Sequence, residues 1–389
     1  MRILYITHTY SLNVWDQGGG EVYCSNLLKE LSRRGHEILV FTPACKRWPK
    51  EEKEFNIRVH MVPTFGHHAL HKYEYVFTAN EAVRLAKEFN AKLVHAQNDI
   101  FPALVGAKVK KALNIPLVVG VEYISEKNAS LNTKLIYWLN RTLLPRIPAD
   151  HFISMSRHAV DHYLVPWGIE KNKIMVLPVS VDLELFKPGP GKKELVENYG
   201  PNLLVSLKPM HATNAQALEL VLRAFKKVLG KHADYHYLLY GGGAKLEYLK
   251  ALAHELGLEK SVHFMGLVNY SDTPSIYNAS QFLVHAFTYE ATTSSSLIDS
   301  LAAGKAVIAT RIGEIPNIVE DAAVLVPPNN VNALAEAMLD LMEHPKKRFE
   351  LEKKARAIAE KRHSLNALGE GIEKVYERAL TSFRTQTKK

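Results

Sequence analysis

Residues 2–42 decide the fold class: they read RILYITH at Arg2–His8, EVYCSNLLKELSRRG at Glu21–Gly35 and EILVFT at Glu37–Thr42. The first and last stretches are short and rich in β-branched and large apolar residues, so they predict buried parallel strands. The middle stretch places its apolar residues on one helical face and ends at Gly35. A strand, a helix and a strand in succession predict a βαβ unit with a right-handed crossover.

The same alternation continues along the chain and predicts an α/β protein. Further strands are expected at 92–97, 115–121, 151–156, 173–179, 203–207, 235–240, 262–266, 282–286, 306–310 and 322–327. The pattern is interrupted by FKPGPG at 186–191, whose prolines and glycines exclude a helix or a central strand. We therefore predict two doubly wound, Rossmann-like domains that face each other across a cleft. The predicted parts are domains at 1–183 and 193–365, a linker at 184–192, and a C-terminal helix at 366–389 that packs back on the first domain.

The composition of the chain excludes several classes of protein. Only Cys24 and Cys45 are present, which excludes a disulfide framework and a four-cysteine zinc site and suits a reducing compartment such as the cytoplasm. No apolar run approaches the roughly 18 residues of a membrane-spanning helix, so we expect any membrane contact to be peripheral, through the first domain at the inner face. The net charge of +9 suits an anionic partner, but no nucleic-acid-binding pattern accompanies it, so nucleic acid is not expected.

Candidate ligand-binding residues follow several predicted strands. Gly18–Gly20 precede the first helix, whose free N–H groups and positive dipole favour an anion; the alternative is a flexible turn. Lys208 follows the strand at 203–207 and could hold a diphosphate, or be a surface lysine. Asn214 is a possible N-cap of the next helix. Gly241–Gly243 follow the strand at 235–240, as a ligand-contacting loop or a tight turn.

The stretch richest in polar groups is YEATTSSSLIDSLAAG at Tyr289–Gly304. Glu290 closes a loop, hydroxyl side chains crowd a predicted helix start, and Asp299 falls in the first turn of that helix. Carboxylates and hydroxyls that converge in this way suit a polyhydroxyl ligand such as a sugar. The alternative is a capping box from Ser296 to Asp299, which would leave Asp299 without a ligand.

Three segments together resemble the retaining GT-B glycosyltransferases of family 4, the glycosyltransferase group 1 type. They are QGGGEVYCSNLLKELSRRGHEILVFTP at 17–43, KIMVLPVSVDLELFKPG at 173–189 and SLIDSLAAGKAVIATRIGEIPNIV at 296–319. The resemblance implies transfer of a hexose-type sugar, with retained configuration, from a nucleotide-diphosphate sugar to a glycan, lipid-linked or small-molecule acceptor. It also implies a donor bound mainly by the second domain, an acceptor bound mainly by the first, no required metal and no cofactor besides the co-substrate.

The resemblance also assigns roles to individual residues. The catalytic residues are expected to be Lys208, which matches a cation that neutralises the leaving diphosphate, together with Glu290 and Glu122. Acceptor binding is expected from Asn98 and Tyr123. Donor binding is expected from Gly18, Gly19, Gly20, Lys208, His211, Gly242, Leu267, Glu290, Thr292, Thr293, Ser294, Ser295 and Asp299.

The chain also departs from the family pattern. Thr213 and Asn214 occupy the neighbourhood of a second cation, which leaves His211 as a substitute. Eight residues instead of seven separate Glu290 from Asp299, and Glu122 stands where many members have a histidine. A non-catalytic nucleotide-sugar or glycan-binding relative is therefore the alternative function, and a phosphorylase or epimerase on the same fold is a further one.

The segment KLIYWLNRTLLPR at Lys134–Arg146 mixes basic and large apolar residues. On the surface it would resemble an interfacial amphipathic helix of the kind that a peripheral membrane enzyme uses. The alternative, which we expect, is a buried crossover helix that precedes the strand at 151–156.

Overall fold

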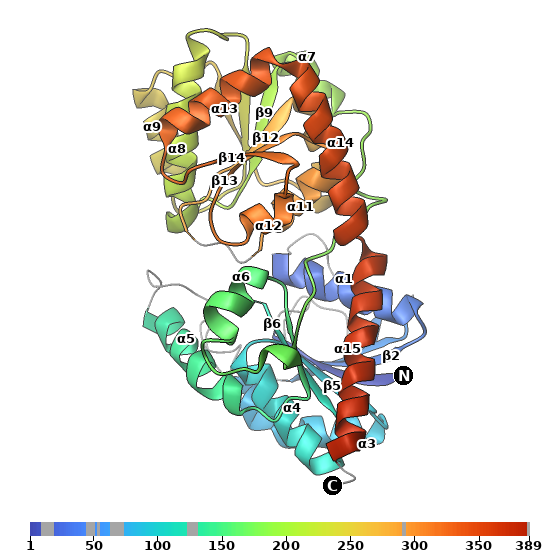
Figure 1. The fold of residues 1–389 in the computed structure, drawn as a ribbon. Coiled ribbons are helices and arrows are strands. Elements are labelled where there is room, and N and C mark those ends of the chain that lie inside the picture. The colour runs from blue at the N-terminus through green and yellow to red at the C-terminus, as the bar shows by residue number, and fades with distance from the viewer. Residues whose placement is uncertain are drawn as a thin grey trace. The chain divides into compact units, whose positions relative to one another are not determined.

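In the computed structural model, the described residues are 1–8, 19–43, 51–52, 55–62, 74–122, 131–289 and 293–386. The chain divides into two compact units. Unit 1 comprises residues 1–179 and 365–389, and unit 2 comprises residues 180–364. The chain therefore leaves unit 1 after its last strand and returns to it with a single C-terminal helix, drawn in red in Figure 1.

Unit 1 is built on an eight-stranded sheet with the order β3-β4-β2-β1-β5-β6-β7-β8. All neighbouring strands are parallel except β3, which is antiparallel to β4. The strands are β1 (Arg2–Ile6), β2 (Glu37–Pro43), β3 (Glu51–Glu52), β4 (Ile57–Val62), β5 (Leu93–Asn98), β6 (Leu117–Val121), β7 (His151–Ser154) and β8 (Ile174–Val176). The order reverses between β1 and β5, as in doubly wound sheets whose ligands bind beyond the carboxyl ends of the strands at such a point.

Helices surround this sheet. They are α1 (Gly19–Arg33), α3 (Ala79–Glu88), α4 (Ile100–Leu113), α5 (Leu131–Leu143), α6 (Arg157–Ala159) and α15 (Leu365–Gln386), with shorter helical turns η2 (Tyr75–Thr78), η3 (Leu144–Arg146), η4 (Val160–Leu164) and η5 (Lys171–Lys173). Local signals set their ends: the Asp99 side chain accepts a hydrogen bond from Phe101 N at the start of α4, and Asn114 ends α4 in a left-handed conformation. Helix α15 packs against α1, β6 and β7.

Unit 2 has a six-stranded parallel sheet with the order β11-β10-β9-β12-β13-β14. The strands are β9 (Leu203–Leu207), β10 (His236–Tyr240), β11 (Val262–Gly266), β12 (Phe282–His285), β13 (Val307–Thr310) and β14 (Ala323–Val326). The helices are α7 (Lys193–Tyr199), α8 (Ala212–Leu229), α9 (Leu246–Glu255), η6 (Tyr270–Asp272), α10 (Thr273–Ala279), α11 (Ser295–Ala302), α12 (Ile315–Val319), α13 (Val331–Glu343) and α14 (Pro345–Arg362). Here the strand order reverses between β9 and β12, so both sheets wind in the Rossmann order.

Strand β4 and helix α3 of unit 1 were not predicted from the sequence, and neither was the two-residue strand β3. Strand β4 reads IRVHMV, and its exposed Arg58 alternates with buried neighbours, so it lacks the continuous apolar run of a central strand. Helix α3 reads ANEAVRLAKE and separates its buried alanines, Ala79, Ala82 and Ala86, from a polar outer side, so its helical period is clear although its buried side chains are small. Strand β4 therefore depends on tertiary packing, whereas α3 carries a local helical pattern that the sequence prediction did not use.

The segment predicted as a linker is packed into unit 2. Phe186 is fully buried, with its ring centroid 5.1 Å from that of Tyr270 and 6.3 Å from that of Tyr277. A Cβ atom at Gly191 would lie 2.5 Å from the Ala279 Cα. The prolines and glycines thus exclude regular structure without making the segment a free connection, because an aromatic anchor and a close backbone contact hold it.

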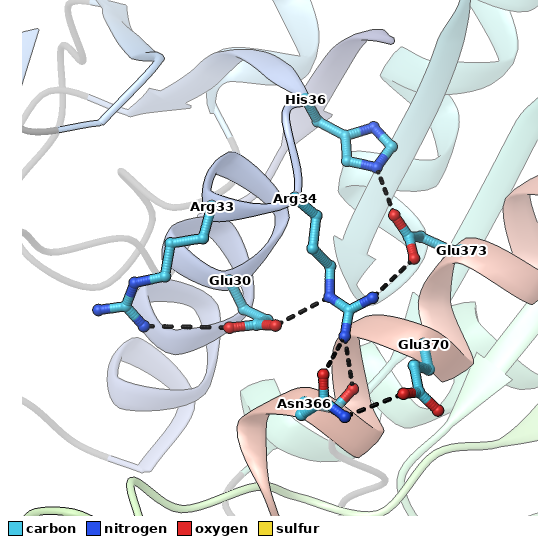
Figure 2. A network of polar contacts seen from close by, with 7 residues as sticks. All are labelled: Glu30, Arg33, Arg34, His36, Asn366, Glu370 and Glu373. Carbon is cyan, nitrogen blue, oxygen red and sulfur yellow. Dashed lines mark hydrogen bonds and ion pairs between the residues drawn. The ribbon is translucent and has the colours of Figure 1, made fainter.

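A polar network fixes α15 on unit 1, as Figure 2 shows. The Arg34 guanidinium donates to Glu30 Oε1 at 2.8 Å, to Glu373 Oε2 at 2.8 Å and to Asn366 Oδ1 at 2.5 Å. The other Glu373 oxygen lies 3.0 Å from His36 Nε2. The Arg34 side chain is only 19% exposed, so its charge is largely removed from water and depends on these partners. Arg34, which directly follows α1, therefore contacts α15 at Asn366 in the first turn and at Glu373 seven residues further along.

We expect Arg34→Ala to lower the free energy of unfolding by about 2 kcal/mol, because it removes the largely buried cation that the Glu30 and Glu373 carboxylates share. Urea denaturation measures this change. The control is Arg84→Ala, which removes an exposed pair with Glu88 on one helix and should cost less than about 0.5 kcal/mol. Equal losses for both variants would show that Arg34 does not anchor α15.

Candidate functional site

Polar side chains gather at the point of each sheet where the strand order reverses. In unit 1 this point lies between β1 and β5, and in unit 2 between β9 and β12. The carboxyl ends of parallel strands meet at one edge, so side chains far apart in the sequence come together there.

In unit 1 the Glu122 carboxylate is held by donors from both neighbouring elements. Glu122 directly follows β6, and its Oε2 accepts from Asn98 Nδ2 at 2.5 Å while its Oε1 accepts from Gln97 Nε2 at 2.9 Å. The Cys24 thiol of α1 lies 3.6 Å from Oε1. Asn98 is itself fixed, because its Oδ1 accepts from Thr7 Oγ1 at 2.5 Å. The structure thus brings together the predicted residues Glu122 and Asn98.

A second layer of buried groups supports this arrangement. His95 Nε2 lies 2.9 Å from Gln97 Oε1, and His95 Nδ1 lies 2.8 Å from the Tyr376 hydroxyl of α15. A Cβ atom at Gly120 would overlap Gln97 Oε1, so the glycine on β6 lets the Gln97 side chain cross the strand toward Glu122. Helix α15 therefore connects to the Glu122 carboxylate through His95 and Gln97.

The electrostatics of this edge follow from burial. Burial raises the pKa of Glu122 to about 7, although the hydrogen bonds from Gln97, Asn98 and Cys24 favour the ionised form. Burial lowers the pKa of His95 to about 4, so this imidazole is neutral at pH 7. A carboxyl group with a pKa near 7 can bind a ligand hydroxyl as an acceptor or, when protonated, as a donor.

In unit 2 the predicted Lys208 lies at the carboxyl end of β9. Its ammonium donates to the Ala286 carbonyl and lies 3.7 Å from the centroid of the Phe287 ring, both just beyond β12. Burial lowers the pKa of Lys208 to about 7. The neighbouring His285 is fully buried, and burial together with the Lys208 charge lowers its pKa to about 3. A partly desolvated cation at this position attracts an anion more strongly than a solvated one does.

The glycines after β10 adapt to the Lys208 loop. Gly241 has φ of +133°, and a Cβ atom there would overlap the Lys208 carbonyl oxygen, so the close approach requires glycine. The neighbouring Gly242 faces the side chain of Leu267, which is 86% exposed just after β11. His211 is exposed, and its Nδ1 would lie 2.9 Å from a Cβ atom at Gly243. Lys208, His211, Gly242 and Leu267 therefore belong to neighbouring loops at one edge of the sheet.

The hydroxyl-rich stretch predicted to start a helix lies at the N-terminus of α11. Its N-cap is Ser294, whose hydroxyl accepts from Leu297 N at 3.4 Å. Ser295 is the first helical residue and Thr293 lies just before the cap, so both flank free N–H groups of the first turn. The capping box from Ser296 to Asp299 was wrong, because the cap falls two residues earlier than Ser296.

Asp299 consequently lies in the second turn of α11 and not in the first, as had been predicted. The carboxyl group is 5% exposed and accepts from the Tyr270 hydroxyl at 3.4 Å. Burial raises its pKa well above the ordinary value. The next residue, Ser300, lies 2.8 Å from His285 Nε2, which connects this turn to the neighbourhood of Lys208.

The structure adds residues that the sequence had not singled out. Thr310, the last residue of β13, accepts from Phe287 N at 2.9 Å through its hydroxyl and donates to Phe287 O at 3.1 Å. Tyr289 donates to Asn214 Oδ1 at 3.4 Å. His285 and Thr310 share one signal that could have identified them: each is a polar residue that ends a buried strand.

Asn214 is not the N-cap of α8, as had been predicted. The helix begins at Ala212 after His211, so Asn214 lies in its first turn and donates from Nδ2 to Pro209 O at 2.9 Å. Gly19 and Gly20 open α1. Four other predicted site residues, Gly18, Tyr123, Glu290 and Thr292, lie outside the described residues.

Comparisons with known proteins identify the class of the chain. The two Rossmann-like sheets match solved GT-B glycosyltransferases, so the protein has the GT-B fold. Residues 17–185 match the family model described as Glycosyltransferase Family 4, and residues 192–358 match the one described as Glycosyl transferases group 1. The two matches follow each other along the chain, so the chain belongs to the family 4, group 1 type of glycosyltransferases and is a glycosyltransferase.

The chain is similar, among others, to one curated protein in sequence and to two solved structures in fold. The alpha-monoglucosyldiacylglycerol synthase of Streptococcus pneumoniae is 28% identical over 82% of this chain and 74% of its own length. Sucrose-phosphate synthase of Thermosynechococcus elongatus has a TM-score of 0.80 at 19% identity and covers 98% of this chain and 99% of that one. HepE of Anabaena, solved in complex with UDP, has a TM-score of 0.79 at 20% identity and covers 97% and 100% of the two chains.

Two absences among the described residues concern metal binding and membrane insertion. No group of three or more His, Cys, Asp or Glu side chains among them could hold a metal ion. None of the helices in this part of the chain is both long enough and apolar enough to cross a membrane.

We expect Glu122→Gln to change how stability depends on pH. The pKa of Glu122 in the folded state lies above its value in the unfolded state. Between about pH 4.5 and 7 this carboxyl group is therefore ionised in the unfolded chain but still largely protonated in the folded one, and the unfolded state gains stability relative to the folded state. The unfolding free energy of the wild type should therefore fall relative to that of the variant by up to about 3 kcal/mol over this interval, and level off above it.

Urea denaturation at a series of pH values measures that difference. The same substitution at Glu247, which is 81% exposed, is the matched control and should have no comparable effect. A constant difference between wild type and Glu122→Gln from pH 4.5 to 8 would contradict the buried carboxyl group.

Proposed function

We propose that this glycosyltransferase is a retaining hexosyltransferase that uses a nucleoside diphosphate sugar and acts on a lipid-linked hydroxyl acceptor without a divalent metal. The observation that carries the proposal is the Lys208 ammonium, held beside the start of the β12–α11 connection at the reversal point of the unit 2 sheet. A fixed, partly desolvated cation stabilises a departing diphosphate. The HepE relative has been solved with UDP and with UDP-glucose, which supports a nucleotide sugar as the donor.

Unit 2 is assigned to the donor. Lys208 would neutralise the diphosphate, the N–H groups after Ser294 would bind phosphate oxygens, and Asp299 would bind ribose hydroxyls. Leu267 offers an exposed apolar surface beside Gly242 for the flat face of the base. Glu290 is assigned to the donor sugar on the family resemblance.

Unit 1 is assigned to the acceptor, with Glu122 and Asn98 as the groups that meet its hydroxyl. In the reaction, the bond between the anomeric carbon and the β-phosphate oxygen breaks and its electron pair stays with the phosphate. The acceptor oxygen forms the new bond to the anomeric carbon, and its proton passes to the departing diphosphate. The streptococcal relative is named for a product on diacylglycerol, which supports a lipid-linked acceptor.

One observation favours the alternative of a relative that binds the donor without turnover. The first turn of α8 carries Thr213 and Asn214, and the Asn214 amide donates to the Pro209 carbonyl instead of supplying a second cation. His211 is then the remaining candidate group at this end of α8. Binding and turnover must therefore be measured separately.

Lys208→Ala is expected to raise the dissociation constant of UDP by at least about tenfold, because it removes a charge-assisted contact to the diphosphate. Isothermal titration measures binding, and release of UDP from UDP-glucose in the presence of a diacylglycerol or glycolipid acceptor measures turnover. Turnover should be lost in Lys208→Ala and persist in EDTA.

The matched control for that experiment is Lys250→Ala, an exposed lysine on α9 that pairs with Glu247. If UDP, GDP and ADP all fail to bind the wild type, the transferase proposal is wrong. If one of them binds but no sugar is transferred or hydrolysed, the binding-only alternative is correct.

Nucleotide affinity should also depend on pH through Lys208. Only the protonated amine attracts the diphosphate, and burial holds its pKa at about 7 in the free protein. A bound anion raises that pKa, so the dissociation constant of UDP should rise by up to about tenfold per pH unit above pH 7. Lys208→Arg should abolish this slope, because the guanidinium stays charged. Parallel slopes for wild type and Lys208→Arg between pH 7 and 9 would assign the dependence to another group.

A further inference from the structure

The exposed large apolar side chains of unit 1 lie on three neighbouring elements. Within the described part of this unit they are Phe77 on η2, Leu104 on α4, and Leu135 and Trp138 on α5. Their exposed fractions are 90%, 36%, 55% and 57% respectively. Helix α4 contacts both η2 and α5, so the three elements are neighbours, and α4 and α5 are labelled in Figure 1. The expectation that α5 is a buried crossover helix is therefore wrong for its outer side.

The orientation of α5 is fixed by its inner side. Asn140 is 4% exposed, and its Oδ1 accepts from Ile100 N at 2.9 Å, which caps the first turn of α4. Tyr137 packs edge-on against Trp167, with ring centroids 5.4 Å apart. Because Asn140 and Tyr137 are docked, Trp138 and Leu135 point outward as a consequence of the packing.

The charges on the same two helices have one sign. Neither Ile100–Leu113 nor Leu131–Arg146 contains an acidic residue. Four exposed basic residues lie on them at helical spacings that match the apolar ones: Lys108 and Lys111 follow Leu104, and Lys134 and Arg141 flank Trp138. Among the described residues, none of these four cations forms an ion pair. We call Phe77, Leu104, Leu135, Trp138 and these four basic residues the α4–α5 face.

We propose that the α4–α5 face docks unit 1 on an anionic lipid bilayer. Tryptophan favours the level of the lipid headgroups, where its ring is apolar and its N–H group stays hydrated. Leucine and phenylalanine side chains at this depth add buried apolar area, and each lysine or arginine near an anionic surface strengthens binding by about fivefold. The inference rests on the proposed function for its purpose, because a lipid-linked acceptor is presented at such a surface.

The charge pattern favours a bilayer over a second copy of this chain. In a twofold dimer through the α4–α5 face, Lys108, Lys111, Lys134 and Arg141 of one copy would meet the same four cations of the other. Like charges brought together in this way oppose association. An anionic bilayer instead supplies the missing negative charge over an extended, deformable surface.

Co-sedimentation of the full chain with vesicles tests the proposal. We expect binding to vesicles of 70% phosphatidylcholine and 30% phosphatidylglycerol, weakened at high salt, and at least tenfold weaker binding to pure phosphatidylcholine vesicles. The double variant Leu135→Glu, Trp138→Glu should lower the partition coefficient for the anionic vesicles at least tenfold. Replacement of the four basic residues by glutamine should do the same and remove the dependence on salt.

The matched control is Phe349→Glu, because Phe349 is also an exposed aromatic side chain, 55% exposed on α14 of unit 2. This substitution should leave vesicle binding unchanged. Thermal unfolding and UDP binding of each variant separate loss of docking from loss of folding or of the donor site. Equal binding of wild type and the Leu135, Trp138 double variant would overturn the proposal. Vesicle-independent self-association that the double variant abolishes would also overturn it, in favour of a dimer. Either result leaves the proposed glycosyl transfer to be judged by its own assay.

Discussion

The carboxylate of Glu122 imposes the main constraint on unit 1. A carboxylate removed from water needs donors for its oxygens, and here Gln97 and Asn98 provide them from the adjacent strand. Each donor in turn depends on something else: Gln97 crosses a glycine on β6 and touches His95, and Asn98 adopts φ of +105° and accepts from Thr7. The central strands are thus arranged around one half-buried acid.

Unit 2 shows the complementary arrangement, with a buried base at the same place in the strand order. Lys208 has no carboxylate partner among the described residues and relies on the Ala286 carbonyl and the Phe287 ring. Carbonyl oxygens and aromatic faces stabilise an ammonium less well than a counter-ion does, so part of its charge remains available to a ligand. One fold, used twice in the chain, therefore presents an acid in one unit and a base in the other. This difference suits a hydroxyl ligand for one edge and a diphosphate for the other.

Sequence reasoning succeeded where a local pattern and the fold agreed. Apolar runs such as LLVSL and VHFMG predicted β9 and β11 directly, and the end of LLVSL placed Lys208 at the carboxyl end of a strand. It failed at the one-sided strand β4, which depends on tertiary contacts, and at two local patterns that were not recognised, the alanine face of α3 and the Ser294 cap of α11. The support of Glu122 by His95 and Tyr376 could not be predicted from the sequence, because no local pattern links His95 to Tyr376, 281 positions further along the chain.

The return of α15 to unit 1 has a consequence for biosynthesis. The ribosome completes β1 to β8 long before it makes α15, and all of unit 2 emerges in between. Until then the surface that Ile372, Val375 and Tyr376 later bury has no cover, and Arg34 lacks its partner Glu373. Unit 1 therefore begins to be synthesised first but completes its fold last. Until α15 is added, its exposed apolar surface is of the kind that chaperones bind.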